Sequence, residues 1–127
     1  MEYNNDFKYD LLLGQIREKQ IAKILKNKSI EIKSEENNGW LKSGNIAIEI
    51  NSRGKPSGLS TTQADYWWHC LQINDEDVAH VVFPVDKLRN LVEKMFHNET
   101  AKVVKGGDNN TSDLVLLPLS TLFKNLK

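Results

Sequence analysis

Two short runs of strictly alternating residues constrain the fold more than any other feature of this sequence. The runs cover residues 29–35 and 45–51, and apolar residues alternate with polar or small ones, with Ile30 and Ile32 in the first run and Ile46, Ile48 and Ile50 in the second. A period of two is typical of a β-strand with one buried face. The polar, glycine-containing segment 36–44 between them predicts a hairpin loop.

The rest of the chain alternates between helical and strand-like patterns. Apolar residues at helical spacing predict a helix over 10–25 and another that begins at Pro84. Ser60-Thr-Thr-Gln63 has the form of a capping box, which predicts a third helix that ends near Leu71. Residues 78–83, 102–105 and 114–117 suit strands, and 119–126 suits a terminal helix. This order predicts an α/β fold, a small mixed sheet flanked by helices.

Composition limits the possible classes of protein. With 127 residues, of which 39% are hydrophobic, the chain suits one domain and is too short for two. Its 17 basic and 17 acidic residues exclude a histone-like polycation, although local basic patches remain compatible with nucleic-acid binding. The single cysteine, Cys70, excludes an internal disulfide and favours a cytoplasmic protein. Since no run of 18 apolar residues occurs, no association with a membrane is expected.

The charged residues of the two alternating runs also share faces. Glu31, Lys33 and Glu35 lie on one face of the first strand, and Glu49 lies on the corresponding face of the second. A hairpin register with Glu35 opposite Glu49 would separate their Cβ atoms by about 5 Å. Two carboxylates at that distance repel each other unless a cation lies between them, and oxygen ligands suit Mg²⁺ or Mn²⁺. The alternative is a charged face that simply meets solvent.

A third carboxylate belongs to the first predicted helix. Glu18 lies on a ridge formed at i, i+3 and i+4 spacing by Leu11, Gly14, Ile21 and Leu25. A carboxylate on an apolar ridge is expected to face the domain, where it needs a partner. The alternative is a residue at the flank of the ridge that pairs with a lysine.

The ordered set of a helical glutamate, two strands with acids and a lysine, and a following helix resembles the PD-(D/E)xK nuclease superfamily. The segment GNIAIEINSRGKPSG at 44–58, followed by TTQADYW at 61–67, is similar to a small phage-type, Holliday junction resolvase-like branch. The resemblance covers roughly residues 10–71. It implies a single restriction-endonuclease-like domain over 1–127, with its site in that region.

The resemblance also implies a set of site residues. Glu18, Glu35 and Glu49 match the metal-binding acids, with Glu31 as the alternative on the first strand. The lysine expected two residues after the second acid is absent, because this position is Asn51. Lys33, which would lie opposite Asn51 in the hairpin register, and Lys55 are the candidates to replace it. Glu31 and Lys33 could themselves match the acid-x-lysine pair of the second strand of the superfamily. This assignment is disfavoured, because no earlier strand is predicted that could supply the acid of the first strand.

The activity that the resemblance implies is Mg²⁺- or Mn²⁺-dependent hydrolysis of DNA phosphodiester bonds, branched DNA included, by a homodimer. The glycine-containing loop 53–58 suits contact with a phosphate backbone, and the predicted helix after it would offer free N–H groups at its start. The residues expected to contact DNA are Arg53, Lys55, Ser57, Thr61, Thr62 and Gln63. Two alternatives remain open: a nuclease-fold protein that binds nucleic acid without cutting it, and a non-enzymatic interaction module.

Overall fold

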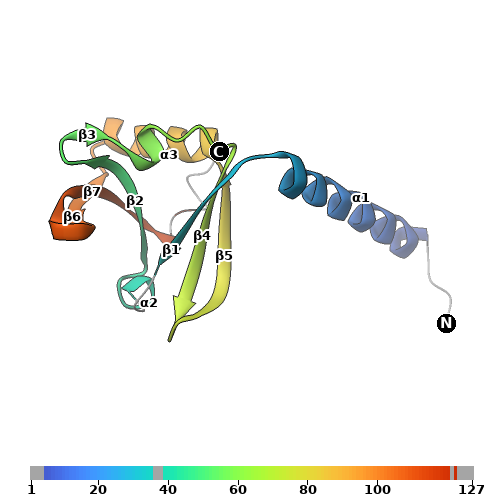
Figure 1. The fold of residues 1–127 in the computed structure, drawn as a ribbon. Helices are drawn as coiled ribbons and strands as arrows, with labels where there is room; N and C mark the ends of the chain where they lie inside the picture. The colour runs from blue at the N-terminus through green and yellow to red at the C-terminus, as the bar shows by residue number, and fades with distance from the viewer. Residues whose placement is uncertain (1–4, 36–38, 121, 123–127) are drawn as a thin grey trace.

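The computed structural model describes residues 5–35, 39–120 and 122, and it confirms the α/β class (Figure 1). Its helices are α1 (Asn5–Asn27), α2 (Gly39–Ser43) and α3 (Val85–His97), with short 3₁₀ helices η1 (Gly58–Ser60) and η2 (Asp108–Asn110). Its strands are β1 (Ile30–Glu35), β2 (Asn45–Ser52), β3 (Lys55–Pro56), β4 (Tyr66–Ile73), β5 (Glu76–Pro84), β6 (Lys102–Gly106) and β7 (Ser112–Pro118).

The strands form two sheets. Sheet A has the order β1-β4-β5, in which β1 runs parallel to β4 and β5 antiparallel to it. Sheet B is antiparallel throughout, with the order β3-β2-β7-β6. The predicted hairpin between the two alternating runs is therefore wrong, because β1 and β2 are strands of different sheets. The segment between them contains the helix α2, and the Trp40 indole Nε1 donates a hydrogen bond of 2.8 Å to the carbonyl of Gln72 at the end of β4.

One hydrophobic core joins the two sheets and α3. Alternation along the strands turns Trp67, Leu71 and Phe83 of sheet A inward, and Ile46 and Ile48 of sheet B meet them from the other side. The apolar stripe of α3 closes the core with four buried residues, Val85, Leu88, Leu91 and Val92. Pro84 precedes the first turn of this helix, where a missing N–H leaves no hydrogen bond unmade, as the sequence predicts.

The predicted helix over 60–71 is wrong. Ser60 is the last residue of η1, residues 61–65 form neither a helix nor a strand, and Tyr66 begins β4. The bulky aromatic residues favour a strand, and both faces of β4 carry buried side chains, since Cys70 is buried as well as Trp67 and Leu71. A strand that is apolar on both faces loses the alternation by which it could be recognised.

The other predicted elements are confirmed within a few residues, apart from the terminal helix over 119–126, most of which lies outside the described residues. Along β7, Asp113 forms an ion pair with Lys105 and accepts a hydrogen bond from the Asn51 side chain. The Lys105 contact is the main reason that the pKa of Asp113 lies below its ordinary value, and Asn51 adds to it. This stabilisation is therefore present at neutral pH and is lost as the pH falls through that lowered pKa.

The helix α1 projects away from both sheets (Figure 1). From Lys8 to Asn27 all its side chains are exposed except Ile24, which is half-buried. The helix over 10–25 is thus confirmed, but its apolar ridge does not face the domain. Among the described helices, none is long and apolar enough to cross a membrane.

Candidate functional site

Glu35 links the two sheets. Its Oε1 accepts a hydrogen bond of 2.8 Å from the backbone N–H of Ala47 in β2, although Glu35 itself belongs to β1 of sheet A. The same oxygen lies 3.2 Å from Nδ1 of His69, and the two side chains are 17% and 1% exposed. Position 47 is two residues from Glu49 on the same face of β2, a separation of roughly 6.6 Å along a strand. Glu35 is thus held close to the strand that carries the second predicted acid.

Two buried side chains of β4, one of them beside Glu35, have polar atoms without a hydrogen bond to a described residue. His69 is buried in β4, and neither ring nitrogen makes an aligned hydrogen bond with a described residue, although Nδ1 is within ion-pair distance of Glu35. The indole Nε1 of Trp67, whose ring centre lies 6.2 Å from that of His69, is also buried without a hydrogen-bond partner among the described residues. Buried polar groups nearly always have partners, so exceptions of this kind often mark the place of a bound water, ion or ligand.

Lys33 and Glu31 lie on the same face of β1 as Glu35. The Lys33 ammonium is 3.8 Å from Oε1 of Glu31 and 5.6 Å from the centre of the Trp67 ring. The predicted common face of these residues is therefore confirmed. The predicted position of Lys33 opposite Asn51 is wrong, because Lys33 pairs with His69 in the parallel register of β1 and β4.

Glu49 is half-buried in β2 and is covered by the loop that follows it. Gly58, at φ +54°, lies so close that a Cβ atom added to it would be 2.3 Å from the carbonyl oxygen of Glu49. Glu49 also borders a polar hollow of about 390 Å³, together with Arg53 and Asp108. The prediction that Glu35 lies opposite Glu49 in a hairpin is wrong, since Glu49 pairs with Leu114 of β7.

Glu18 is not brought to these residues. It is exposed on α1, nine residues before the end of that helix, which corresponds to roughly 14 Å along the axis. Among the described residues, one group of three potential metal ligands has its ligand atoms within 4.8 Å of one another, and none of Glu18, Glu31, Glu35 or Glu49 belongs to it. Convergence of Glu18, Glu35 and Glu49 is therefore not found in this arrangement.

The residues expected to contact DNA line one loop. Arg53 and Lys55 are exposed at the turn between β2 and β3, as are Thr61 and Gln63 farther along. The helix N-terminus predicted at Thr61 and Thr62 is absent, because residues 61–65 form neither a helix nor a strand. The backbone carbonyl of Thr62 instead accepts a hydrogen bond from the guanidinium of Arg89 in α3.

Ser57, in the same loop, has a buried hydroxyl group. Its Oγ makes no hydrogen bond with any described residue, whereas its backbone N–H donates to the carbonyl of Ile50, 3.0 Å away. That backbone bond holds the loop against β2 next to Glu49. The expected phosphate contact of Ser57 would thus require a rotated side chain, because its backbone N–H already donates to Ile50.

The group of three potential ligands consists of Cys70, Asp77 and His80 on the outer face of sheet A. Cys70 lies opposite His80 in the β4–β5 register, a contact that neither residue spacing nor the lone cysteine predicted. Burial raises the pKa of the Cys70 thiol, and the nearby Asp77 raises it further. A thiolate and an imidazole suit zinc better than magnesium.

A hydrogen bond to His80 opposes metal binding in this geometry. The indole Nε1 of Trp68 donates to Nδ1 of His80 at 2.8 Å. Neutral histidine that accepts at Nδ1 carries its proton at Nε2, the nitrogen that lies 3.8 Å from Asp77. Binding of a metal at Nε2 would require the other tautomer, which cannot accept the Trp68 bond. The cluster is therefore better described as a hydrogen-bonded surface network than as a preformed metal centre.

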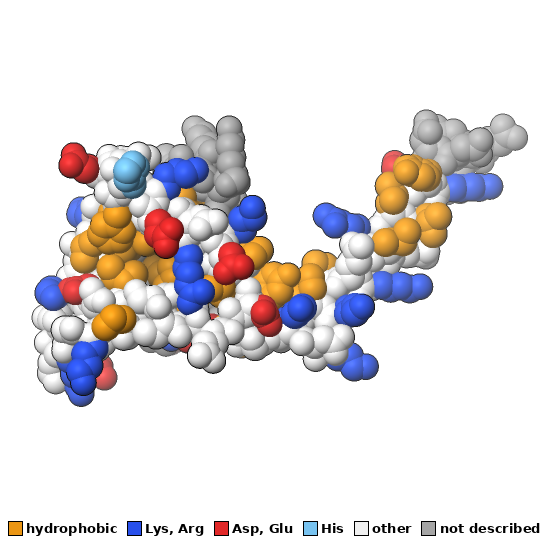
Figure 2. All heavy atoms as spheres, turned by 90° about the horizontal axis from the view of Figure 1, so that it is seen from above, with side chains coloured by type: hydrophobic (Ala, Val, Ile, Leu, Met, Phe, Trp, Pro, Cys, Tyr) orange, Lys and Arg blue, Asp and Glu red, His pale blue; other side chains and the backbone are white. Residues whose placement is uncertain are grey.

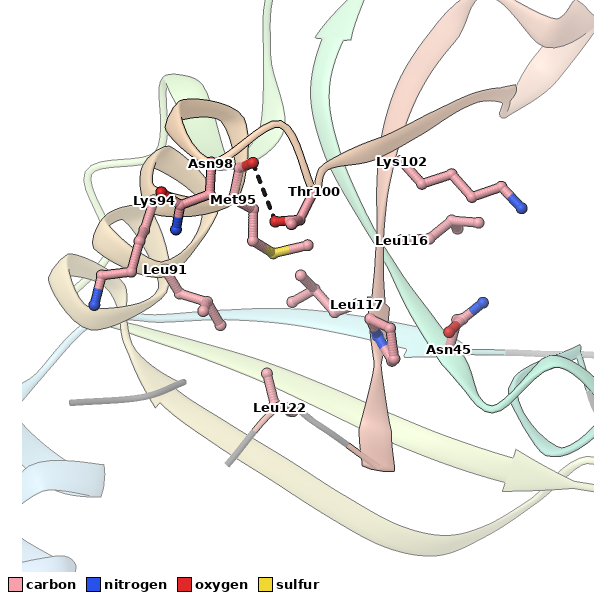
Figure 3. Close-up of a pocket in the computed structure, with 11 residues that line it drawn as sticks. Asn45, Leu91, Lys94, Met95, Asn98, Thr100, Lys102, Leu116, Leu117 and Leu122 are labelled. Carbon is pink, nitrogen blue, oxygen red and sulfur yellow. Dashed lines mark hydrogen bonds between the residues drawn. The ribbon is translucent and has the colours of Figure 1, made fainter. Parts of the chain in front are cut away.

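A separate apolar hollow of about 370 Å³ lies between α3 and sheet B (Figure 3). Leu91 and Met95 of α3 face Leu117 of β7 and Leu122 across it, and the hydroxyl of Thr100 donates to the carbonyl of Met95 at its upper edge. Neither Glu35 nor Glu49 lines this hollow, so it is distinct from the site at the junction of the sheets.

Comparison with known proteins finds no family model, no curated protein and no solved structure that matches this chain. The resemblance to the PD-(D/E)xK superfamily therefore depends on the residues of this sequence alone.

Proposed function

We propose that this protein is a Mg²⁺-dependent nuclease whose site lies at the junction of β1 and β2. The observation that carries the proposal is the contact of Glu35 with the backbone of β2, two residues from Glu49. Magnesium in enzymes commonly takes one or two carboxylates, with water and substrate phosphate as its other ligands. Glu35 and Glu49 offer that donor set, so Glu18 is not needed.

The remaining residues supply complementary chemistry. Both contacts of Glu35 with described residues use Oε1, so the carboxylate retains the capacity to bind a cation. Lys33 provides a positive charge on the same face of β1, where it could stabilise the negative charge that develops on a phosphate. A bound Mg²⁺ would polarise the phosphate and lower the pKa of a coordinated water.

The catalytic test compares single variants of the full chain on plasmid DNA and on a four-way junction. Glu49→Ala and Lys33→Ala are expected to lower Mg²⁺-dependent cleavage by at least about 100-fold while remaining folded. Glu93→Ala removes an exposed carboxylate from α3 and is the matched control, with wild-type cleavage expected. Full activity of the Glu49 variant would contradict the proposal.

The loop carrying Arg53 and Lys55 gives a second prediction, which concerns binding alone. Each cation that contacts a phosphate contributes about 0.9 to the slope of log affinity against log salt concentration. Arg53→Ala/Lys55→Ala is therefore expected to lower that slope by about 2 in fluorescence anisotropy titrations with Ca²⁺ in place of Mg²⁺. Lys87→Ala/Lys94→Ala on α3 is the control, and an unchanged slope in the loop variant would exclude the loop as a DNA contact.

The second candidate function is nucleic-acid binding without cleavage. It is favoured by position 51, where the superfamily pattern has a lysine and this chain has an asparagine that donates to Asp113, 3.4 Å away. DNA binding that depends on Arg53 and Lys55, without any Mg²⁺- or Mn²⁺-dependent nicking by the wild type, would select this alternative.

A further inference from the structure

Two apolar surfaces of this chain have no partner among the described residues. The first is α1, where Tyr9, Leu11, Leu12, Leu13, Ile16, Ile21 and Leu25 are each 41–63% exposed. Figure 2 shows apolar side chains along the projecting helix, with lysine and arginine side chains beside them. Exposed apolar side chains gathered on one element commonly mark a surface of interaction with a protein or a membrane.

The second surface is the outer face of sheet A. Because Trp67 and Phe83 point into the core, their neighbours Trp68 and Val82 point outward. Ile32, Trp68 and Val82 lie in register and form a row across all three strands. Ile32 is 62% exposed and Val82 43%, so this row is open to solvent.

The joint between α1 and β1 keeps the helix away from its own sheet. Only Lys28 and Ser29 separate the two elements, and Lys28 continues the helical hydrogen bonding to the carbonyl of Ile24. Ser29 is held by Asp65 through its N–H and its hydroxyl, at 3.1 and 3.2 Å, and the N–H of Asp65 donates to the Ser29 carbonyl at 3.0 Å. Folding α1 back onto sheet A of the same chain would break this clamp.

Charge distinguishes the possible partners. Between Lys8 and Asn27, α1 carries five basic side chains against two acidic ones, whereas the β4–β5 turn presents Asp75, Glu76 and Asp77 in succession beside the open face. Opposite charges favour the contact of α1 with this sheet. Pairing of α1 with a second α1 is disfavoured. The apolar stripe of Tyr9, Leu12 and Ile16 continues at heptad spacing into Lys19 and Lys23, so a helix pair would place charged lysines at its apolar seam.

We propose that α1 packs on the outer face of sheet A of a second copy of this chain, so that two copies exchange helices reciprocally. This interface does not depend on the nuclease activity. It covers both apolar surfaces that the monomer leaves open.

The oligomeric state of the full chain, measured by analytical ultracentrifugation, is the test. The wild type is expected to be a dimer. Ile32→Glu on sheet A and Leu12→Glu/Ile21→Glu on α1 are each expected to raise the dimer dissociation constant at least about tenfold, because they place a carboxylate in the apolar contact. Val103→Glu is the matched control, since Val103 is an exposed apolar residue on β6 of the other sheet and its dimer should persist.

A mixing experiment identifies which surfaces meet. In an equimolar mixture of the sheet variant and the helix variant, one intact helix can bind one intact sheet, so a heterodimer should form where neither variant dimerises alone. A dimer that persists in the Ile32 variant would overturn the proposal in favour of contact between helices. A wild type that stays monomeric up to submillimolar concentration would also overturn it, whether or not that monomer binds vesicles containing phosphatidylserine.

Discussion

Gly58→Ala is expected to lower the free energy of unfolding by about 3 kcal/mol. Two effects add in this substitution. Alanine at φ +54° occupies the left-handed region, which costs an L-residue about 1–2 kcal/mol. The new methyl group would also lie 2.3 Å from the carbonyl oxygen of Glu49, so that the loop or β2 must shift. Urea denaturation followed by circular dichroism measures the change.

Gly54→Ala is the matched control for this prediction. Gly54 has φ +76°, but a Cβ atom there meets nothing within 4 Å. Its cost should therefore be the backbone term alone, about 1–2 kcal/mol. Equal destabilisation by the two variants would show that the contact of Gly58 with β2 contributes nothing. A larger loss in the Gly58 variant would show that this contact holds the loop of Arg53 and Lys55 against the strand of Glu49.

The periodicity of the sequence predicted which segments are helices and strands better than it predicted their partners. The face with Ile46 and Ile48 is buried in β2, as predicted, but the predicted buried face of β1 is wrong, because Ile32 is 62% exposed and the charged residues of the other face are half-buried. An alternating pattern shows which residues of a strand share a face. It contains no information on which strand lies alongside. β1 pairs with β4, which is 36 residues away in register, and β4 had itself been predicted as a helix from the capping-box pattern at residues 60–63.

The same limit applies to the candidate site. The shared face of Glu31, Lys33 and Glu35 follows from a period of two and was predicted correctly. His69 could not be assigned to that face without the parallel register that places it beside Lys33. The position of Glu18 depends on the direction in which α1 leaves the domain. That direction is set by the clamp between Ser29 and Asp65, which no local pattern shows.

Glu35 offers a test that separates a structural from a catalytic role. Glu35→Ala is expected to lower the free energy of unfolding by about 1–3 kcal/mol, because the Ala47 N–H loses its acceptor and His69 loses the carboxylate beside it. Glu35→Gln retains a carbonyl oxygen at the same place, so its cost should stay below about 1 kcal/mol. Glu31→Gln, which alters an exposed ion pair, should cost no more than that.

The activities of these variants should not follow their stabilities. A neutral amide binds Mg²⁺ far more weakly than a carboxylate, so Glu35→Gln is expected to lose Mg²⁺-dependent cleavage although it folds normally. If Glu35→Ala loses stability but Glu35→Gln keeps wild-type cleavage, Glu35 has only a structural role, in which it links the two sheets. If both variants lose cleavage and only the alanine variant loses stability, the Glu35 carboxylate both links the sheets and takes part in the reaction. This double role would explain why a half-buried acid lies at the junction of the sheets.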